Sequence, residues 1–408
     1  MNPTRRQVLF SLAGAGAAAL FDRGRVPAWL GNGVACTSSA PVGELLGTLP
    51  LGLQTQAFGV KYGGSGLDAR MVTDLSLLEP GKLITANDLA YIRTEIPAAA
   101  AAHTGPWTIA TGGLAEKEGA LNLDAISKQA RSMGPHLFEC SGNANPSNFG
   151  LMSVAEWDGI PLADIVAGLR PRSDATGVLV SGVDHDGQVS ARSTAGASWV
   201  FPLASLSKLG AFLAVRMNGE PLPADHGKPV RLVVPGWYGC TWIKWVNEIR
   251  LVGPDEPSTS QMIEFAGRTH QGQAFKLARE FLPAEIQTAA TPVRVEKRRT
   301  ASGIHYRIVG IVWGGTKAVD RLAIRIQPRR PRSDDGAAAA PAAVNAAFEP
   351  FEVCPTPTTH VMWSLWEYTW KPTAPGTYDI ALKVADATVP QRRLTSGYYT
   401  RQVTIDQV

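Results

Sequence analysis

The sequence predicts a two-domain protein of the α+β class. At 408 residues the chain is longer than one ordinary hydrophobic core supports, so we expect two domains. The part before residue 255 mixes apolar runs, turns and one segment with helical spacing. Short segments with period-two alternation then follow one another, separated by Gly and Pro, which is typical of a β-sandwich.

The composition indicates a folded globular chain and gives no sign of a nucleic-acid partner. Apolar residues make up 45% and charged residues 18%, which excludes a disordered chain. The net charge of +4 is small for this length, and the densest basic cluster, residues 329–332, lies in low-complexity sequence. The four cysteines show neither a CxxC motif nor zinc spacing: Cys36, Cys140, Cys240 and Cys354. A Cys36–Cys354 disulfide is conceivable, but sequence alone does not establish connectivity.

Residues 1–40 predict an export signal and a lead-in. Arg5 and Arg6 precede a weakly apolar run, Leu12 to Phe21, that is too short to span a bilayer. This is the pattern of a twin-arginine signal, which exports proteins already folded. We therefore expect a periplasmic protein.

The first domain is expected over residues 41–255. The apolar run from Leu89 to Pro97 contains one arginine, Arg93, which either faces water at a strand end or is directed at an anion. Residues 107–113 predict a strand and a turn. Residues 121–133 have helical spacing.

Cys140 is the candidate reactive residue of this domain. The apolar pair Leu137–Phe138 leads into Cys140 and then into Ser-Gly-Asn, a turn composition. A thiol at such a strand-to-loop junction suits a soft metal or a nucleophilic role, and the alternative is a small buried hydrophobe. Residues 177–187 predict a strand and an acidic turn, where Asp184 more simply caps the turn than binds a metal.

Residues 217–245 carry the strongest pattern in the chain. They predict a turn, a strand, a Pro-Gly turn and a second strand, with His226, Arg231 and Lys244 at the joints. Three potential cations on loops fit an anionic ligand such as a phosphate.

The second domain is expected over residues 256–408. Alternating segments predict its strands: 292–296, 306–315, 319–326, 363–370 and 378–386. Residues 328–350, which include four consecutive alanines, predict a long excursion between two of these strands.

The motifs together resemble the sulfite oxidase family of molybdopterin-dependent oxidoreductases. The sequence around Cys140 and Trp157 is similar to the family's Cys-Ala-Gly-Asn and Trp-x-Gly-Val-Pro-Leu segments. Residues 91–97 are similar to Phe-Val-Arg-Asn-His-Leu-Pro. Residues 217–245 are similar to Met-Asn-Gly-x-Pro-Leu-Pro-x-Asp-His-Gly-x-Pro-x-Arg followed by Val-Lys-Trp. The resemblance covers roughly residues 75 to 390.

The resemblance implies a fold, a cofactor and a set of site residues. The fold is a sulfite-oxidase-type mixed α/β molybdopterin-binding domain followed by an immunoglobulin-like β-sandwich, which usually forms a homodimer. The cofactor is molybdenum–molybdopterin, with the Cys140 sulfur on the metal. The implied cofactor-binding residues are Tyr91, Ile92, Arg93, Thr94, Glu95, Cys140, Asp184, His226, Arg231, Trp242, Ile243 and Lys244. The implied catalytic residues are Cys140, Arg93, Arg192 and Trp157, the last of which is expected to wall the pocket.

Two positions depart from the animal and plant enzymes. The family's second arginine after the cysteine is replaced by Asn145, and Arg192 falls near the substrate tyrosine. These changes resemble the bacterial sulfite and sulfane dehydrogenase branch, so the implied substrate is sulfite or a sulfane sulfur held on a carrier protein. The sequence has no Cys-x-x-Cys-His for a covalent haem. The implied electron acceptor is therefore a separate c-type cytochrome.

Three other functions compete with this one. The first is a molybdopterin-dependent sulfoxide reductase of the same fold. The second is a thiol hydrolase in which Cys140 is the nucleophile and His136, His185 or His226 is the base. The third is a non-catalytic periplasmic binding protein that uses the tryptophan-rich sandwich.

Overall fold

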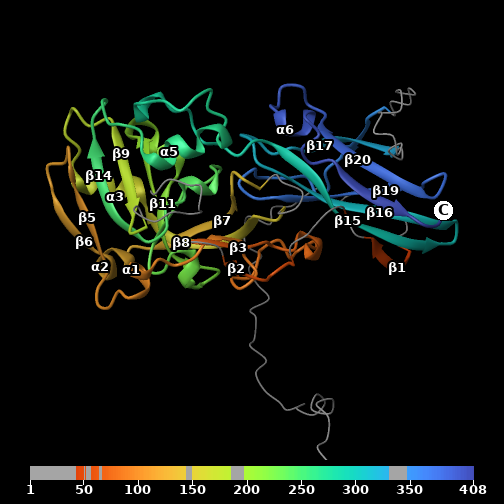
Figure 1. Ribbon diagram of the computed structural model, residues 1–408, viewed down its shortest axis with the longest axis horizontal. Coiled ribbons are helices and arrows are strands. Elements are labelled where there is room, and N and C mark those ends of the chain that lie inside the picture. Colours follow the sequence, from red (N-terminus) through yellow and green to blue (C-terminus); the bar gives the residue numbers. More distant parts are fainter. Residues whose placement is uncertain are drawn as a thin grey trace, which may run out of the picture.

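The protein has two β-rich parts joined side by side, as the computed structural model shows (Figure 1). The structure describes residues 43–49, 51, 57–63, 67–143, 149–184, 197–329 and 347–408. The expected export signal, Arg192 and Asn145 lie outside these residues. No helix in the described part of the chain has the length and apolarity to cross a membrane.

Two five-stranded sheets and a small three-stranded sheet form the first part. One sheet has the order β10 (Ser198–Pro202), β9 (Gly177–Gly182), β14 (Val246–Val252), β5 (Thr108–Gly113) and β6 (Gly119–Asn122). The second has the order β12 (Glu220–Pro221), β11 (Phe212–Met217), β8 (Met152–Pro161) and β7 (Arg131–Glu139), and β13 (Arg231–Val233) also pairs with β11. The small sheet joins β2 (Tyr62–Gly63), β3 (Asp68–Met71) and β4 (Ile92–Thr94).

Short helices connect these strands. The α-helices of the first part are α1 (Ala98–Ala101), α2 (Leu123–Ser127), α3 (Leu162–Leu169), α4 (Leu206–Leu209) and α5 (Ser260–Phe265). The single-turn helices are η1 (Leu75–Leu77), η3 (Leu203–Ser205), η4 (Ala224–His226), η5 (Gly239–Thr241), η6 (Ala266–Arg268) and η7 (Ala278–Glu280). Helical spacing over 121–133 predicted more helix than the chain forms, because β6 ends at Asn122 and β7 begins at Arg131.

The second part is a sandwich of two four-stranded antiparallel sheets. One sheet has the order β1 (Glu44–Leu49), β15 (Ala289–Thr300), β16 (Gly303–Trp313) and β19 (Ser364–Trp370). The other has the order β18 (Glu349–Glu352), β17 (Arg321–Pro328), β20 (Gly376–Val384) and β21 (Arg401–Ile405), with α6 (Arg392–Thr395) before its last strand. The α+β class and the two-layered β-rich second domain are confirmed.

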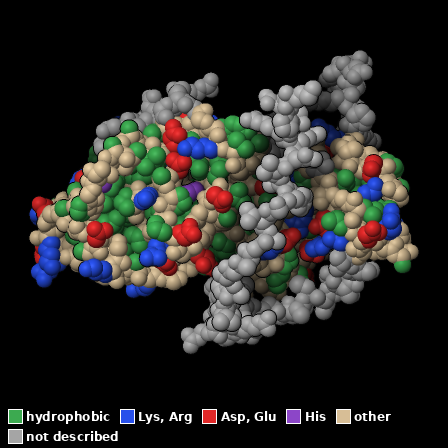
Figure 2. All heavy atoms as spheres, turned by 90° about the horizontal axis from the view of Figure 1, so that it is seen from below, with side chains coloured by type: hydrophobic (Ala, Val, Ile, Leu, Met, Phe, Trp, Pro, Cys, Tyr) green, Lys and Arg blue, Asp and Glu red, His purple; other side chains and the backbone are tan. Residues whose placement is uncertain are grey.

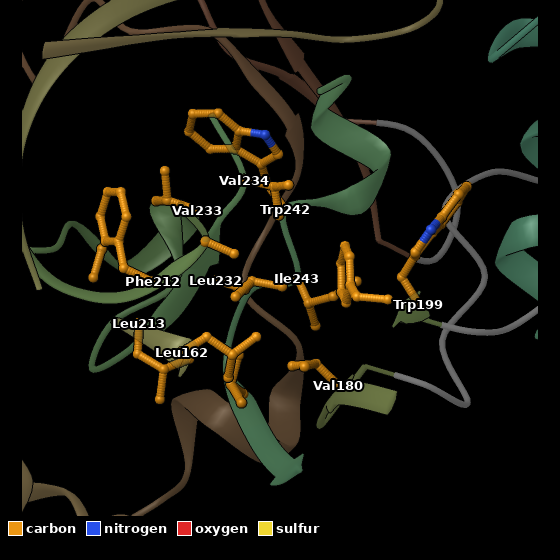
Figure 3. Packing of buried hydrophobic residues seen from close by; sticks show 14 of the residues in the cluster. Leu162, Val180, Trp199, Phe212, Leu213, Leu232, Val233, Val234, Trp242 and Ile243 are labelled. Atoms are coloured by element: carbon orange, nitrogen blue, oxygen red, sulfur yellow. The ribbon is translucent and has the colours of Figure 1, made fainter. Parts of the chain in front are cut away.

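Each part has its own core. In the first core, Leu232 and Val233 of β13 pack with Trp242 and Ile243 from the next segment (Figure 3). Residues as late as Ala284 belong to this core, and the clustered buried residues from Ile286 onward belong to the second core, which also includes earlier residues such as Leu137 and Tyr238. The change of core therefore falls about thirty residues after the expected boundary at 255. The early strand β1, expected in the first domain, instead completes a sandwich sheet.

Cys354 is disulfide-bonded, whereas Cys140 and Cys240 carry free thiols. Cys36 lies outside the described residues. The surface in Figure 2 intersperses side chains of both charges over the described part of that face.

Candidate active site

A cavity in the first part collects most of the predicted site residues. The cavity and its open mouth enclose about 800 Å³. Its predicted lining residues are Tyr91, Ile92, Arg93, Thr94, Cys140, Asp184, His226, Arg231, Trp242, Ile243 and Lys244. Segments 150 residues apart in the sequence thus meet around one space, which opens to solvent.

Cys140 follows directly after β7, at the strand-to-loop junction that the sequence predicts. The Cys140 amide donates to the Leu151 carbonyl at 2.9 Å, and the Asn143 amide donates to the Cys140 carbonyl at 2.9 Å. The Gly142 amide donates to the Cys140 sulfur at 3.4 Å. Backbone contacts therefore fix the thiol at the cavity wall before any ligand binds.

The three predicted cations come together because two segments pair across the backbone. Arg231 and Lys244 form an isolated antiparallel bridge, and the Leu232 amide donates to the Ile243 carbonyl at 2.7 Å. Gly227 lies beside them with a φ of 106°, and a Cβ there would come within 2.9 Å of the Arg231 Cβ. The glycine after His226 is therefore required by both its conformation and its close packing.

Arg231 is buried among aromatic rings. Its guanidinium carbon lies 5.3 Å from the ring centre of Trp157 and 5.5 Å from that of Trp242. One guanidinium nitrogen donates to the His226 carbonyl at 3.2 Å. Burial lowers the pKa of Arg231 to about 10, so the side chain stays charged at neutral pH.

The pKa values of His226 and Lys244 are both lowered, and a bound anion would oppose these shifts. Burial, reinforced by Arg231 and Lys244, lowers the pKa of His226 to about 3. Burial and the charge of Arg231 lower the pKa of Lys244 to about 7. The Lys244 amine donates to the carbonyls of Thr94 at 2.7 Å and Asp225 at 2.8 Å, so its remaining proton is available to a ligand.

The donors of this cluster fit a phosphate-bearing cofactor. His226 Nε2 and Arg231 Nε are buried and have no hydrogen-bond partner among the residues that the structure describes. Buried polar atoms normally have partners, and a bound anion would supply them while relieving the repulsion between the cations. Within the described residues, no three His, Cys, Asp or Glu side chains gather to hold a metal. Two free cysteines, Cys140 and Cys240, line the cavity, and the sequence resemblance implies Cys140 as the metal ligand.

Arg93 reaches the cavity from β4 and is paired with a carboxylate. It forms an ion pair with Asp68 of β3, and its side chain is 25% exposed. A substrate at the mouth would therefore meet a guanidinium whose charge is largely balanced.

Two predicted residues do not line the cavity. Glu95 instead pairs with Lys61 at 3.1 Å. Trp157 is 1% exposed and packs behind Phe138 and Trp242, with ring centres 5.6 Å and 5.9 Å away. The expectation that Trp157 walls the pocket is corrected accordingly: it supports the wall from behind. Arg192 lies outside the described residues.

Several lining residues were missed by the sequence analysis: Phe138, Ala197, Asp225, Gly239, Cys240, Gln261 and Phe265. Asp225 and Gly239 stand inside the long 217–245 motif, so their position could have identified them. Gln261 and Phe265 come from α5, and nothing in their local sequence signals a site.

Comparison with known proteins defines the class. Residues 94–260 match the family model for the oxidoreductase molybdopterin binding domain. The chain is 30% identical to rat mitochondrial sulfite oxidase over 223 residues, covering 50% of this chain and 40% of the relative. It is 32% identical to the Macaca fascicularis enzyme over 184 residues, with coverages of 43% and 33%. Against the NADPH nitrate reductase of Fusarium oxysporum the identity is 29% over 199 residues, with coverages of 45% and 21%.

These curated relatives are longer proteins, and the chain spans at most two fifths of each of the three. The crystal structure of the sulfane dehydrogenase SoxCD from Paracoccus pantotrophus has the same fold, with a TM-score of 0.58 at 15% identity, covering 97% of this chain and all of the other. The family match thus identifies residues 94–260 as an oxidoreductase molybdopterin binding domain, with molybdenum–molybdopterin as its cofactor. The chain is similar to members of the sulfite oxidase family in its molybdopterin-binding part.

Proposed function

We propose that this protein is a periplasmic enzyme that oxidises sulfite or a sulfane sulfur held on a carrier protein. The single observation that carries the proposal is that the free thiol of Cys140 lines the same cavity as His226, Arg231 and Lys244. The Cys140 sulfur can bind a metal, and the basic side chains in the same cavity can bind a phosphate.

Each residue group has a separate task in this proposal. His226, Arg231 and Lys244 bind the anionic end of the cofactor, and Cys140 supplies the protein thiolate to its metal. The cofactor carries the oxygen and electron transfer. Arg93 orients the substrate at the mouth by hydrogen bonding. In each two-electron step the sulfur gains one oxygen atom from water, the water loses two protons, and two electrons pass to the separate acceptor; sulfite needs one such step and a sulfane sulfur needs three to reach a sulfonate.

Metal analysis and substrate assays test the proposal on natively exported protein. The wild type is expected to contain stoichiometric molybdenum and to reduce a c-type cytochrome with sulfite or with a persulfide on a carrier. Cys140→Ser is expected to lose this turnover. A Cys140→Ser protein with unchanged molybdenum and unchanged turnover would contradict the role of the thiol.

A sulfoxide reductase is the second candidate, and the Arg93–Asp68 pair favours it. Because Asp68 balances the guanidinium charge, the mouth suits a neutral dipolar substrate as well as an anion. Assays with a sulfoxide and a reduced dye separate the two directions. The match to the molybdopterin binding domain does not support the thiol hydrolase or the non-catalytic binding protein.

The proposal also includes a periplasmic location, a separate electron acceptor and a homodimer. The proposed periplasmic location rests on Arg5 and Arg6 and on the apolar run after them. An Arg5→Lys, Arg6→Lys double variant is expected to stay in the cytoplasm, and fractionation measures this. The proposed electron acceptor is a separate c-type cytochrome, and sedimentation of the exported enzyme tests the proposed homodimer.

A further inference from the structure

One peptide group connects the sandwich to the thiol of Cys140. The carbonyl of Ser141 and the amide of Gly142 belong to the same planar peptide unit. Its amide donates to the Cys140 sulfur at 3.4 Å. At its other end, a guanidinium nitrogen of Arg393 donates to the Ser141 carbonyl at 3.4 Å. A cation at the carbonyl polarises the peptide and strengthens the amide as a donor to sulfur.

Arg393 is fixed in this position from several sides. It belongs to α6 of the second part and is 8% exposed. The Arg393 guanidinium donates to the Tyr399 hydroxyl at 3.0 Å, and its carbon lies 5.0 Å from the ring centre of Tyr238. Arg393 also lies 3.9 Å from a carboxylate oxygen of Glu139, the residue immediately before Cys140.

Glu139 is the counter-charge and is completely buried. One carboxylate oxygen accepts a hydrogen bond from the Trp313 indole at 2.8 Å, and the other accepts one from the side-chain amide of Asn143 at 3.1 Å. Burial raises the pKa of Glu139, while Arg393, Trp313 and Asn143 oppose that rise. Trp313 and Arg393 both belong to the sandwich. Their contacts with the Glu139 carboxylate therefore hold the loop that carries the Cys140 thiol.

Hydrogen bonds to a metal-bound sulfur draw electron density from it and alter the reduction potential of the metal. We propose that Arg393 is a positioning residue that acts on the Cys140 sulfur through the Ser141–Gly142 peptide, so that the sandwich tunes the redox centre. The proposal rests on the role of Cys140 as metal ligand given under the proposed function. Loss of the Arg393 charge is expected to leave more electron density on sulfur and to lower the potential.

The test uses the exported holoenzyme and a charge-balanced variant. Arg393→Gln combined with Glu139→Gln removes both charges, so neither side chain is left buried and unpaired. Molybdenum content, the midpoint potential from an electron paramagnetic resonance titration, and the sulfur-to-metal charge-transfer absorption are measured. The double variant is expected to keep its molybdenum, to titrate at a lower potential and to shift the absorption band. The single variant Arg393→Lys is expected to show a smaller shift in potential than the double variant, because lysine keeps the positive charge but lacks the planar guanidinium group.

Arg298 provides a matched control. It is also a buried sandwich arginine, 8% exposed, but it pairs with Glu296 at 2.7 Å and donates to the Gly43 carbonyl at 3.0 Å. Glu296 keeps Arg294 as a partner at 2.8 Å when Arg298 is replaced. Arg298→Gln is expected to leave the potential and the absorption band unchanged.

A double variant with full molybdenum, wild-type potential and wild-type absorption would overturn the proposal. If the double variant does not fold, Tyr399→Phe removes one anchor of Arg393 at almost constant volume, and a shift of the same sign and smaller size is expected. An unshifted Tyr399→Phe protein would then be the contrary result. The assignment of Cys140 as metal ligand is tested separately. If that assignment is wrong, Cys140→Ser will leave the absorption band unaltered.

Discussion

At the scale of single residues, the site depends on burying basic side chains beside one another. Burial keeps His226 neutral, and burial together with the charge of Arg231 makes Lys244 a weaker base. The sequence predicted these residues because they fall inside one long motif with fixed spacing. It did not predict Arg393, which comes from about 250 residues after Cys140 and acts across a domain interface.

Arg93 gives the first prediction. Arg93→Gln is expected to raise the apparent KM about tenfold or more, because a charged hydrogen bond to substrate is lost, while molybdenum content stays constant. Steady-state kinetics and metal analysis measure the two quantities. Arg70→Gln is the control, since Arg70 also approaches Asp68, at 3.5 Å, but does not line the cavity. Unchanged kinetics in Arg93→Gln would remove this residue from the substrate pocket.

The buried histidines give a prediction for pH. Burial lowers the pKa of His136 to about 4 and that of His226 to about 3, so the unfolded chain binds protons more readily than the folded one. Stability is therefore complete above the ordinary histidine pKa of about 6.5 and is lost on acidification below it, by about 1.4 kcal/mol per pH unit for each histidine.

Urea unfolding of the cofactor-free protein at a series of pH values measures this slope. His136→Gln is expected to reduce the slope, and replacement of the exposed His103 by Gln is expected to leave it unchanged. A stability independent of pH below 6.5 would show that both buried imidazoles titrate normally.

At the scale of elements, strand ends and single-turn helices position the site. The predicted strand-to-loop junction at Cys140 is confirmed, because apolar residues and turn formers lie in sharp succession there. The helix expected over 121–133 is limited to α2, because the ends of this segment belong to strands: β6 pairs with β5, and β7 pairs with β8. Apolar spacing alone does not show where such strand pairing ends a helix.

The helix η5 yields an element-scale prediction. A Cβ on Gly239 would lie 2.6 Å from the Tyr91 hydroxyl and 3.2 Å from the Glu139 carbonyl. Gly239→Ala is expected to displace η5 or Tyr91 from the cavity wall and to reduce molybdenum content severalfold, with the fold retained. Metal analysis and circular dichroism measure both effects. Gly168→Ala in α3 is the control, because a Cβ there meets no atom within 4 Å. Full metal loading in Gly239→Ala would contradict this close packing.

At the scale of the whole molecule, the two parts share an interface that the sequence did not reveal. Leu137 of β7 belongs to the second core, and its amide donates to the Val361 carbonyl at 2.7 Å. The Trp363 indole donates to the Leu83 carbonyl at 3.0 Å. The sequence predicted two domains from length and periodicity, but contacts between domains leave no periodic signal.

This interface predicts that the two parts unfold together. Calorimetry of the holoenzyme is expected to show one transition, because separation would expose Leu137 and would remove Trp313 and Arg393 from Glu139. Trp313→Phe, which removes a hydrogen bond to Glu139, is expected to lower the transition temperature and the molybdenum content together. Two well-separated transitions in the wild type would disprove this coupling.

The strand β1 has a consequence for synthesis in the cell. Residues 44–49 find their partners at residues 295–299, so a ribosome must translate most of the chain before this early strand can dock. The nascent polypeptide thus cannot complete its sandwich while it is being made. An export route that waits for a finished, cofactor-loaded molecule would suit such a chain better than one that threads it across the membrane as it emerges.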